Sequence, residues 1–115
     1  MNWGLLAVIN LYGCDRNFIR NKKIVKRFIK ELCNLIDMER FGKAIVKKFG
    51  EGTLEGVSAI QFIKTSSITI HFDEQKNRAF IDLFSCKNFN GKKAEQFSKQ
   101  FFKAKKSKMI LIKRE

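Results

Sequence analysis

The sequence contains no proline, only one histidine and only three cysteines, and it has no long apolar run. Without proline, no X-Pro isomerisation step slows folding. Cys14, Cys33 and Cys86 form no Cys-x-x-Cys pair, so with a single histidine they indicate neither a disulfide framework nor a zinc site. No run approaches membrane-spanning length. We therefore expect a cytoplasmic protein with reduced thiols, no bound metal and no membrane association.

Acidic residues are also scarce, with 11 Asp and Glu against 24 Lys and Arg, which gives a net charge of +13. Such a balance fits a nucleic-acid or anionic-membrane partner, or a solvated lysine-rich surface. The basic residues are scattered along the chain, and no recognised nucleic-acid motif lies among them. We favour the solvated surface and do not expect a nucleic-acid partner.

The chain is long enough to bury a core of modest size. Its 115 residues are 44% apolar and include 12 phenylalanines, which supply a large buried area per residue. These values argue against disorder. We expect one domain over residues 1–115.

The apolar periodicity predicts the order of the secondary-structure elements. Strands are expected at 5–11, 43–49, 57–63, 67–72, 79–85 and 109–112, and amphipathic helices at 21–37 and 91–102. A glycine-rich loop covers 50–56. This order implies an α/β (α+β) fold, a two-layer sandwich in which two helices cover one face of a mainly antiparallel sheet.

Three residues suggest a specific chemistry. Ser66 lies at the break between two expected strands, His71 on the strand that follows and Cys86 at a strand end. A serine that attacks the preceding carbonyl, a base that removes its α-proton and a proton donor for the product are what a chain needs to build and use a pyruvoyl group. Each residue also has a plainer interpretation, as a packed histidine, a small buried cysteine or a turn serine.

The ordered set of motifs resembles the short prokaryotic type of S-adenosylmethionine decarboxylase proenzyme, over nearly the whole chain. The similar segments are Leu6–Asp15 ending in Leu-Tyr-Gly-Cys-Asp, Gly56-Val57-Ser58, Ser66-Ser67-Ile68-Thr69-Ile70-His71, and Ile81-Asp82-Leu83-Phe84-Ser85-Cys86. The spacings between Ser58, Ser66, His71 and Cys86 match the family pattern without gaps. Together these motifs are specific, although no single one is.

The resemblance implies a role for each residue. The Ser66 hydroxyl attacks the Thr65 carbonyl, the chain breaks between Thr65 and Ser66, and Ser66 becomes the pyruvoyl group. His71 is the processing base, and Ser58 helps to hold the processing intermediate. The pyruvoyl group forms a Schiff base with the substrate amine, and Cys86 returns the proton after carbon dioxide leaves. The family also implies a homodimer of cleaved protomers.

The resemblance places Phe49 against the adenine and Gln75 against the ribose of the substrate. The chain departs from the family here, because a glutamate stands at the position of Gln75, another glutamate at Thr65 and a histidine at Ser67. A carboxylate accepts both ribose hydroxyl hydrogens, whereas an amide presents one acceptor and one donor group.

The expected function is a self-processing decarboxylase of S-adenosylmethionine in spermidine biosynthesis. The departures leave three alternatives open. The same chemistry could act on ornithine or arginine, the chain could be a non-processing regulatory paralogue, or, on charge alone, it could be a nucleic-acid-binding domain.

Overall fold

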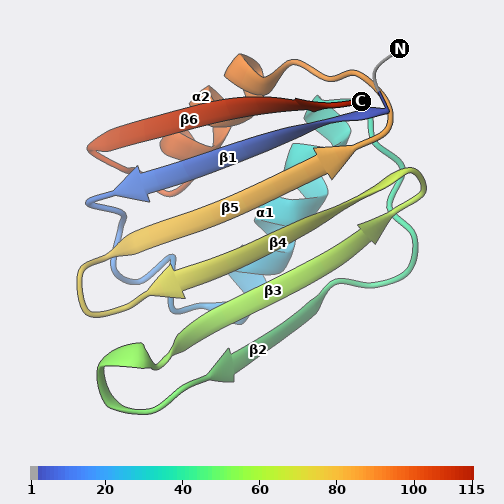
Figure 1. Cartoon of the computed structure of the whole chain (residues 1–115). Helices are drawn as coiled ribbons and strands as arrows, with labels where there is room; N and C mark the ends of the chain where they lie inside the picture. The colour runs from blue at the N-terminus through green and yellow to red at the C-terminus, as the bar shows by residue number, and fades with distance from the viewer. Residues whose placement is uncertain (1–2) are drawn as a thin grey trace.

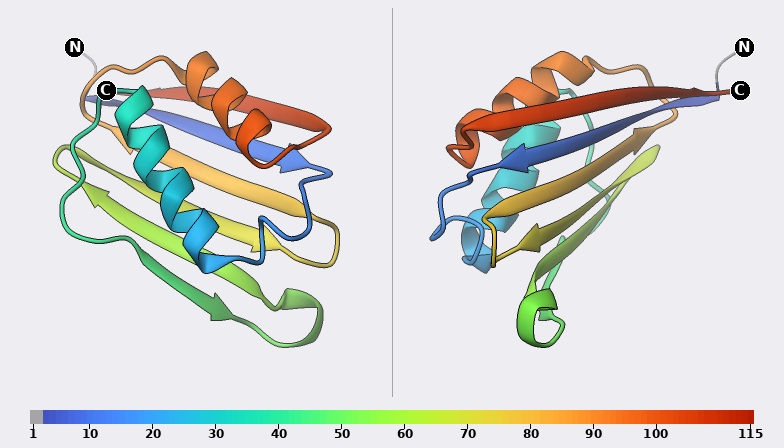
Figure 2. Two further views of the ribbon diagram at one scale, coloured as in Figure 1. Left: turned by 180° about the vertical axis from the view of Figure 1, so that it is seen from behind. Right: turned by 60° about the vertical axis from the view of Figure 1, so that its left-hand side comes forward.

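The computed structural model describes residues 3–115. The elements follow in the order β1 (Gly4–Tyr12), α1 (Lys22–Leu35), β2 (Ile45–Phe49), the 3₁₀ turn η1 (Gly52–Leu54), β3 (Gly56–Ile63), β4 (Ser66–Asp73), β5 (Arg78–Ser85), α2 (Gly91–Phe101) and β6 (Lys106–Arg114). The strands form one antiparallel sheet in the order β2-β3-β4-β5-β1-β6 (Figure 1). Both helices pack on the same face of this sheet (Figure 2), so the expected two-layer α+β sandwich is confirmed.

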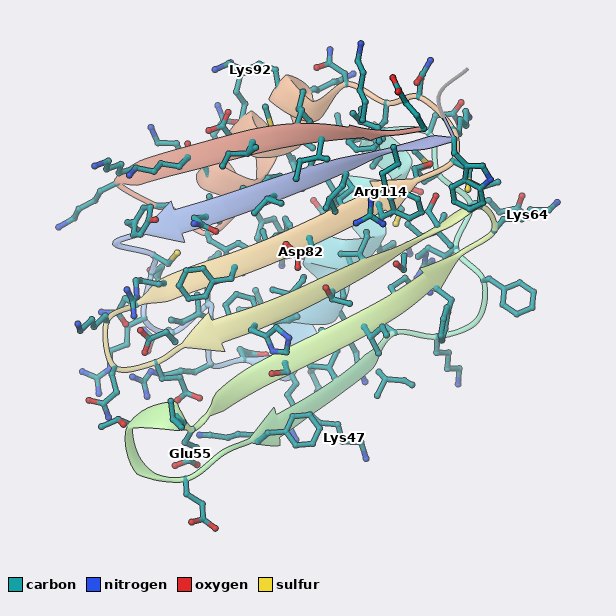
Figure 3. The ribbon with its side chains drawn as sticks, viewed as in Figure 1. Lys47, Glu55, Lys64, Asp82, Lys92 and Arg114 are labelled. Atoms are coloured by element: carbon teal, nitrogen blue, oxygen red, sulfur yellow. The ribbon has the colours of Figure 1, made fainter. Side chains whose placement is uncertain are left out.

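Strict alternation of side chains gives the sheet two different faces. In β4, Ile68, Ile70 and Phe72 are buried beneath the helices, whereas Thr69 and His71 point to the opposite side. Among the described residues no layer covers that opposite side, which we call the open face. Figure 3 looks onto it and shows Asp82 of β5 and Lys47 of β2 there. The open face is therefore available to a second molecule.

Helix α1 begins at its N-cap Asn21, whose side chain accepts hydrogen bonds from the backbone N–H groups of the second and third helical residues. It ends before Asp37, which has a positive φ of 58°. The fully buried stripe consists of Val25, Phe28, Ile29, Leu32 and Cys33. Ile24 and Leu35 lie beside this stripe and are half-buried.

Five phenylalanine rings join the two helices to the sheet. Phe102 is fully buried, and its ring centroid lies 4.7 Å from Phe28 of α1 and 5.3 Å from Phe72 of β4. Phe97 and Phe101 of α2 complete the cluster at 5.8 and 5.2 Å from Phe28. Aromatic pairs at these separations contribute beyond their buried area, so the cluster is a major source of stability for a small fold.

Strand β6 is longer than the predicted 109–112. It pairs with β1 from the Tyr12–Lys106 pair to the Gly4–Arg114 pair. Its lysines hide the alternation that marks a strand, and they suit its place at the edge of the sheet, where charged side chains discourage pairing with other chains.

Candidate active site

The Thr65–Ser66 bond lies at the tip of the β3–β4 hairpin. Ile63 and Ser66 are the last paired residues, so only Lys64 and Thr65 form the connection. The segment that follows α1 supports this tip from outside. The Lys64 N–H group donates to the Glu39 carbonyl at 2.9 Å, and the Phe41 N–H group donates to the Phe62 carbonyl at 2.9 Å. Backbone hydrogen bonds from the segment after α1 therefore hold the hairpin tip.

The β4–β5 register brings Cys86 next to this bond. Ser66 pairs with Ser85, and the Cys86 N–H group donates to the Thr65 carbonyl oxygen at 3.1 Å. The Ser66 hydroxyl is 3.1 Å from the Thr65 hydroxyl. A hydrogen-bond donor on a carbonyl oxygen stabilises the negative charge that develops there during nucleophilic attack. The arrangement thus combines a hydroxyl, an activated carbonyl and a thiol at one end of the sheet.

Buried contacts fix the end of β5 that carries Cys86. The Ser85 hydroxyl is fully buried, donates to Met38 Sδ at 3.6 Å and accepts from the Lys87 N–H group at 2.9 Å. Cys86 itself is exposed, whereas Cys14 and Cys33 are buried. Burial raises the pKa of both Cys14 and Cys33 to about 11. Cys86 is therefore the thiol that a reactant can reach in the described chain.

Ser58 and His71 form a second pair on the open face. They are directly opposite in the β3–β4 ladder, and Ser58 Oγ lies 2.9 Å from His71 Nδ1. Gly56 permits this close strand approach, since a Cβ there would lie 2.2 Å from the Phe72 carbonyl oxygen. The two side chains are therefore in direct contact on the open face.

The two pairs lie at opposite ends of the sheet. Five residues separate Ser66 from His71 on the same strand, which is about 17 Å at roughly 3.4 Å per residue. In Figure 3 two labelled residues mark these opposite ends, Lys64 next to Thr65 at one and Glu55 just before β3 at the other. The sequence assigns Ser66 and His71 to one reaction. A single chain does not bring the two residues together, because no turn lies between them.

A cavity of about 500 Å³ lies beside His71. It is lined by Thr53, Leu54, Glu55, His71, Phe72, Asp73, Gln75, Lys76, Arg78 and Phe80. Gln75, which we predicted to bind substrate, is among these residues. Phe49, the last residue of β2, does not line the cavity, and its side chain is 58% exposed. Leu54 of η1 is among the lining residues.

Sequence reasoning missed Arg78 and Phe80. The Arg78 guanidinium is bound to the Asp73 carboxylate at 2.6 and 2.8 Å and lies 5.4 Å from the Phe80 ring centroid. Strand alternation is the signal that could have found Phe80, because it pairs with His71 and therefore shares its face. Burial raises the pKa of Asp73, but the hydrogen bonds from Arg78 and from the Lys76 and Gln75 backbone N–H groups outweigh it and lower the pKa below its usual value. These bonds fix the turn that carries Gln75.

Two further properties of residues 3–115 bear on function. This part of the chain contains no group of three or more metal-binding side chains close enough to hold an ion. None of its helices has the length and apolar character needed to cross a bilayer.

Known proteins resemble this chain over most of its length. Residues 6–115 match the family model described as S-adenosylmethionine decarboxylase. A Clostridium botulinum (strain Langeland) protein named S-adenosylmethionine decarboxylase proenzyme is 31% identical over 111 residues, covering 94% of this chain and 92% of the relative. One of the same name from Saccharolobus islandicus (strain L.S.2.15) is 34% identical over 77 residues, covering 67% of this chain and 59% of the relative.

The fold has a solved counterpart. The crystal structure of the adenosylmethionine decarboxylase from Aquifex aeolicus superposes with a TM-score of 0.82 at 16% identity, covering 98% of this chain and 91% of that one. At that identity the match supports the fold alone. The family match over residues 6–115 and the 31% identical relative carry the assignment, and the chain belongs to the S-adenosylmethionine decarboxylase family.

Proposed function

We propose that the chain is a self-processing, pyruvoyl-dependent decarboxylase of S-adenosylmethionine, acting in spermidine biosynthesis. The observation that carries the proposal is the Cys86 N–H group on the Thr65 carbonyl, with the Ser66 hydroxyl on the next residue. The family membership and the word proenzyme in the names of the relatives support it. The cysteines are free, which fits the proposed reducing, cytoplasmic setting.

Processing would begin at Ser66. Its Oγ attacks the Thr65 carbonyl carbon while the Cys86 N–H group stabilises the oxyanion, and the peptide C–N bond breaks to leave an ester. A base then removes the Ser66 α-proton, the Cβ–Oγ bond breaks and the 1–65 fragment leaves as a carboxylate. The dehydroalanine that remains takes up water and releases ammonia, which leaves a pyruvoyl group at position 66.

The residues around this end of the sheet fit such a group. When formed, it supplies an electron-withdrawing carbonyl that stabilises the charge left as carbon dioxide departs. Cys86 follows Ser85, the pairing partner of Ser66, and is the group that we propose delivers the proton to the product. The cavity beside His71, with Gln75 at its rim, would hold the nucleoside part of the substrate.

His71 and Ser66 can meet only if two copies combine. The open face exposes Ile45, Phe49, Phe62, Ile110 and Ile112, which a monomer would leave in water. Two open faces can pack about 10 Å apart, related by a two-fold axis that runs across the strands. This axis reverses the strand direction, so one end of each sheet lies over the opposite end of the other sheet. This places the strand end that carries Ser66 and Cys86 in one protomer over Ser58 and His71 of the partner subunit. We therefore propose a homodimer in which each site uses both chains.

Mass spectrometry of the purified protein tests the proposal. We expect a 1–65 fragment and a 66–115 fragment that Edman degradation cannot enter, because its amino end is a keto-acyl group. The Ser66→Ala variant should fold and remain intact. Release of labelled carbon dioxide from S-adenosylmethionine, but not from ornithine or arginine, identifies the substrate. A wild-type chain that stays whole, with no carbon dioxide released, would favour a regulatory paralogue.

A further inference from the structure

The basic residues that the decarboxylase site does not use gather on the helix side of the molecule. Lys22, Lys23, Lys26, Arg27 and Lys30 are all exposed on α1. At 3.6 residues per turn they occupy about 140° of the helix circumference, next to the arc of the buried stripe. The exposed side of α1 is thus a cationic surface.

The loops at both ends of α1 extend this surface. A recess of about 690 Å³ joins Arg20 to Lys22 and Lys23, and another of about 360 Å³ joins Lys26 to Arg40 and Lys43. Arg16 adjoins Arg20 in a third recess. We call these nine residues the α1 strip: Arg16, Arg20, Lys22, Lys23, Lys26, Arg27, Lys30, Arg40 and Lys43.

Few carboxylates neutralise the α1 strip. Glu31 is bound to Arg27 at 3.2 Å and the buried Glu74 to Arg20 at 2.9 Å. Within residues 3–115 the other seven cations of the strip make no salt bridge. Nearby acids are already engaged elsewhere, Asp37 with Lys87 and Glu39 with Lys64. The strip is therefore complementary to an extended anion.

The spacing and one aromatic residue indicate which anion. Lys22, Lys26 and Lys30 repeat every turn, about 6 Å apart along the helix axis, which suits a chain of phosphates. Phe41 follows Arg40 of the strip in the sequence, and its side chain is 72% exposed. Cationic tracks with exposed aromatic rings are typical of single-stranded nucleic-acid sites, where the rings stack on bases. A membrane fits less well, because the apolar side chains of α1 are turned into the core.

We propose that the α1 strip binds single-stranded nucleic acid, with the lysines on phosphates and Phe41 stacked on a base. The strip lies on the side of the sheet opposite the open face (Figure 2), so a dimer formed through the open faces leaves two strips facing outward. Binding there requires neither pyruvoyl formation nor turnover, and the two activities can be separated by mutation.

Fluorescence anisotropy with a labelled oligouridylate of roughly 20 nucleotides tests the strip. The Lys26→Glu/Lys30→Glu variant should weaken binding at least tenfold and flatten the salt dependence. The matched control is Lys105→Glu/Lys113→Glu, which makes the same charge change beyond α2, at exposed positions outside the strip. The control should lose less than threefold. Both variants should self-cleave and turn over like the wild type.

Phe41→Ala supplies the second readout. It should weaken oligouridylate binding about five- to tenfold and leave the salt dependence unchanged, because it removes stacking and no charge. Equal losses of oligouridylate affinity in both charge variants would show that only the net charge matters, and would overturn the proposal. So would binding that vanishes at physiological salt in the wild type, or a wild type that ignores the oligonucleotide yet binds phosphatidylserine vesicles through α1.

Discussion

Cys86 differs from the two other cysteines in its surroundings, and the difference has a chemical consequence. Burial raises the pKa of Cys14 and Cys33 to about 11, so at pH 8 about one thiol in a thousand is the reactive thiolate. We expect a disulfide reagent to modify Cys86 first, and the buried pair only after unfolding. Absorbance titration of native and denatured protein measures this. The Cys86→Ala variant should show no fast thiol; a fast thiol remaining in that variant would contradict the burial of the other two.

Asp73 should couple stability to pH. Its pKa is lowered in the folded state by Arg78 and two backbone N–H groups, despite burial, so between the folded and unfolded pKa values the unfolded chain binds more protons. Its contribution is therefore complete above about pH 4 and is lost as the pH falls through the folded pKa. Urea unfolding of wild type and Asp73→Asn should show a stability difference that is constant from pH 5 to 7 and shrinks below about pH 4.

The control for this experiment is Glu51→Gln, in the exposed loop before η1 and without a salt bridge in the described chain. Its stability should follow the wild type across the range. A difference for Asp73→Asn that grows as the pH falls would show that the sign of the coupling is wrong. Because Asp73 also holds the turn of Gln75, the same variant should raise the KM for S-adenosylmethionine.

At the scale of elements, the phenylalanine cluster is where helices and sheet depend on each other. Phe102 is fully buried between Phe28 of α1 and Phe72 of β4. Phe102→Ala should cost about 3–5 kcal/mol, a large part of the stability of a chain of this size, and Phe102→Leu clearly less. Denaturant unfolding in the Ser66→Ala background keeps the chain uncut during the measurement.

Phe41→Ala is the matched exposed control for Phe102. Its ring is 72% exposed, so the change should alter stability by no more than about 0.5 kcal/mol. Comparable losses for Phe41 and Phe102 would contradict the assignment of the core.

The elements also show what sequence patterns could and could not predict. The strand at 67–72 could be predicted because its two-residue period, which puts Thr69 and His71 on one face, is a local property. The contact between Cys86 and Thr65 depends on the Ser66–Ser85 register, a pairing between distant segments that no local pattern encodes. Phe49 at the substrate stays a prediction, and the cavity beside His71 is lined by Leu54 of η1 and not by Phe49.

At the scale of the molecule, the separation of His71 from Ser66 leads to a mixing experiment. Alone, Ser66→Ala cannot cut, and His71→Ala should stall as an ester that hydroxylamine cleaves. In a hybrid dimer, the strand end with Ser66 of the His71→Ala chain would lie over the intact His71 of the Ser66→Ala chain. Co-expression with different tags should therefore restore cutting of the His71→Ala chain alone, in about half of its copies when pairing is random.

The restored cutting in this mixture depends on Ser66 and His71 coming from different chains, and not on which group acts as the base. If one chain carried a complete site, both variants would be defective within themselves, and mixing them would restore nothing. A second pairing supplies the contrast. Cys86 and Ser66 lie together at one end of the same sheet, so the proton donor and the pyruvoyl precursor should act from one chain. Mixing Ser66→Ala with Cys86→Ala should therefore leave turnover as low as in Cys86→Ala alone, because every cut chain in the mixture lacks the thiol.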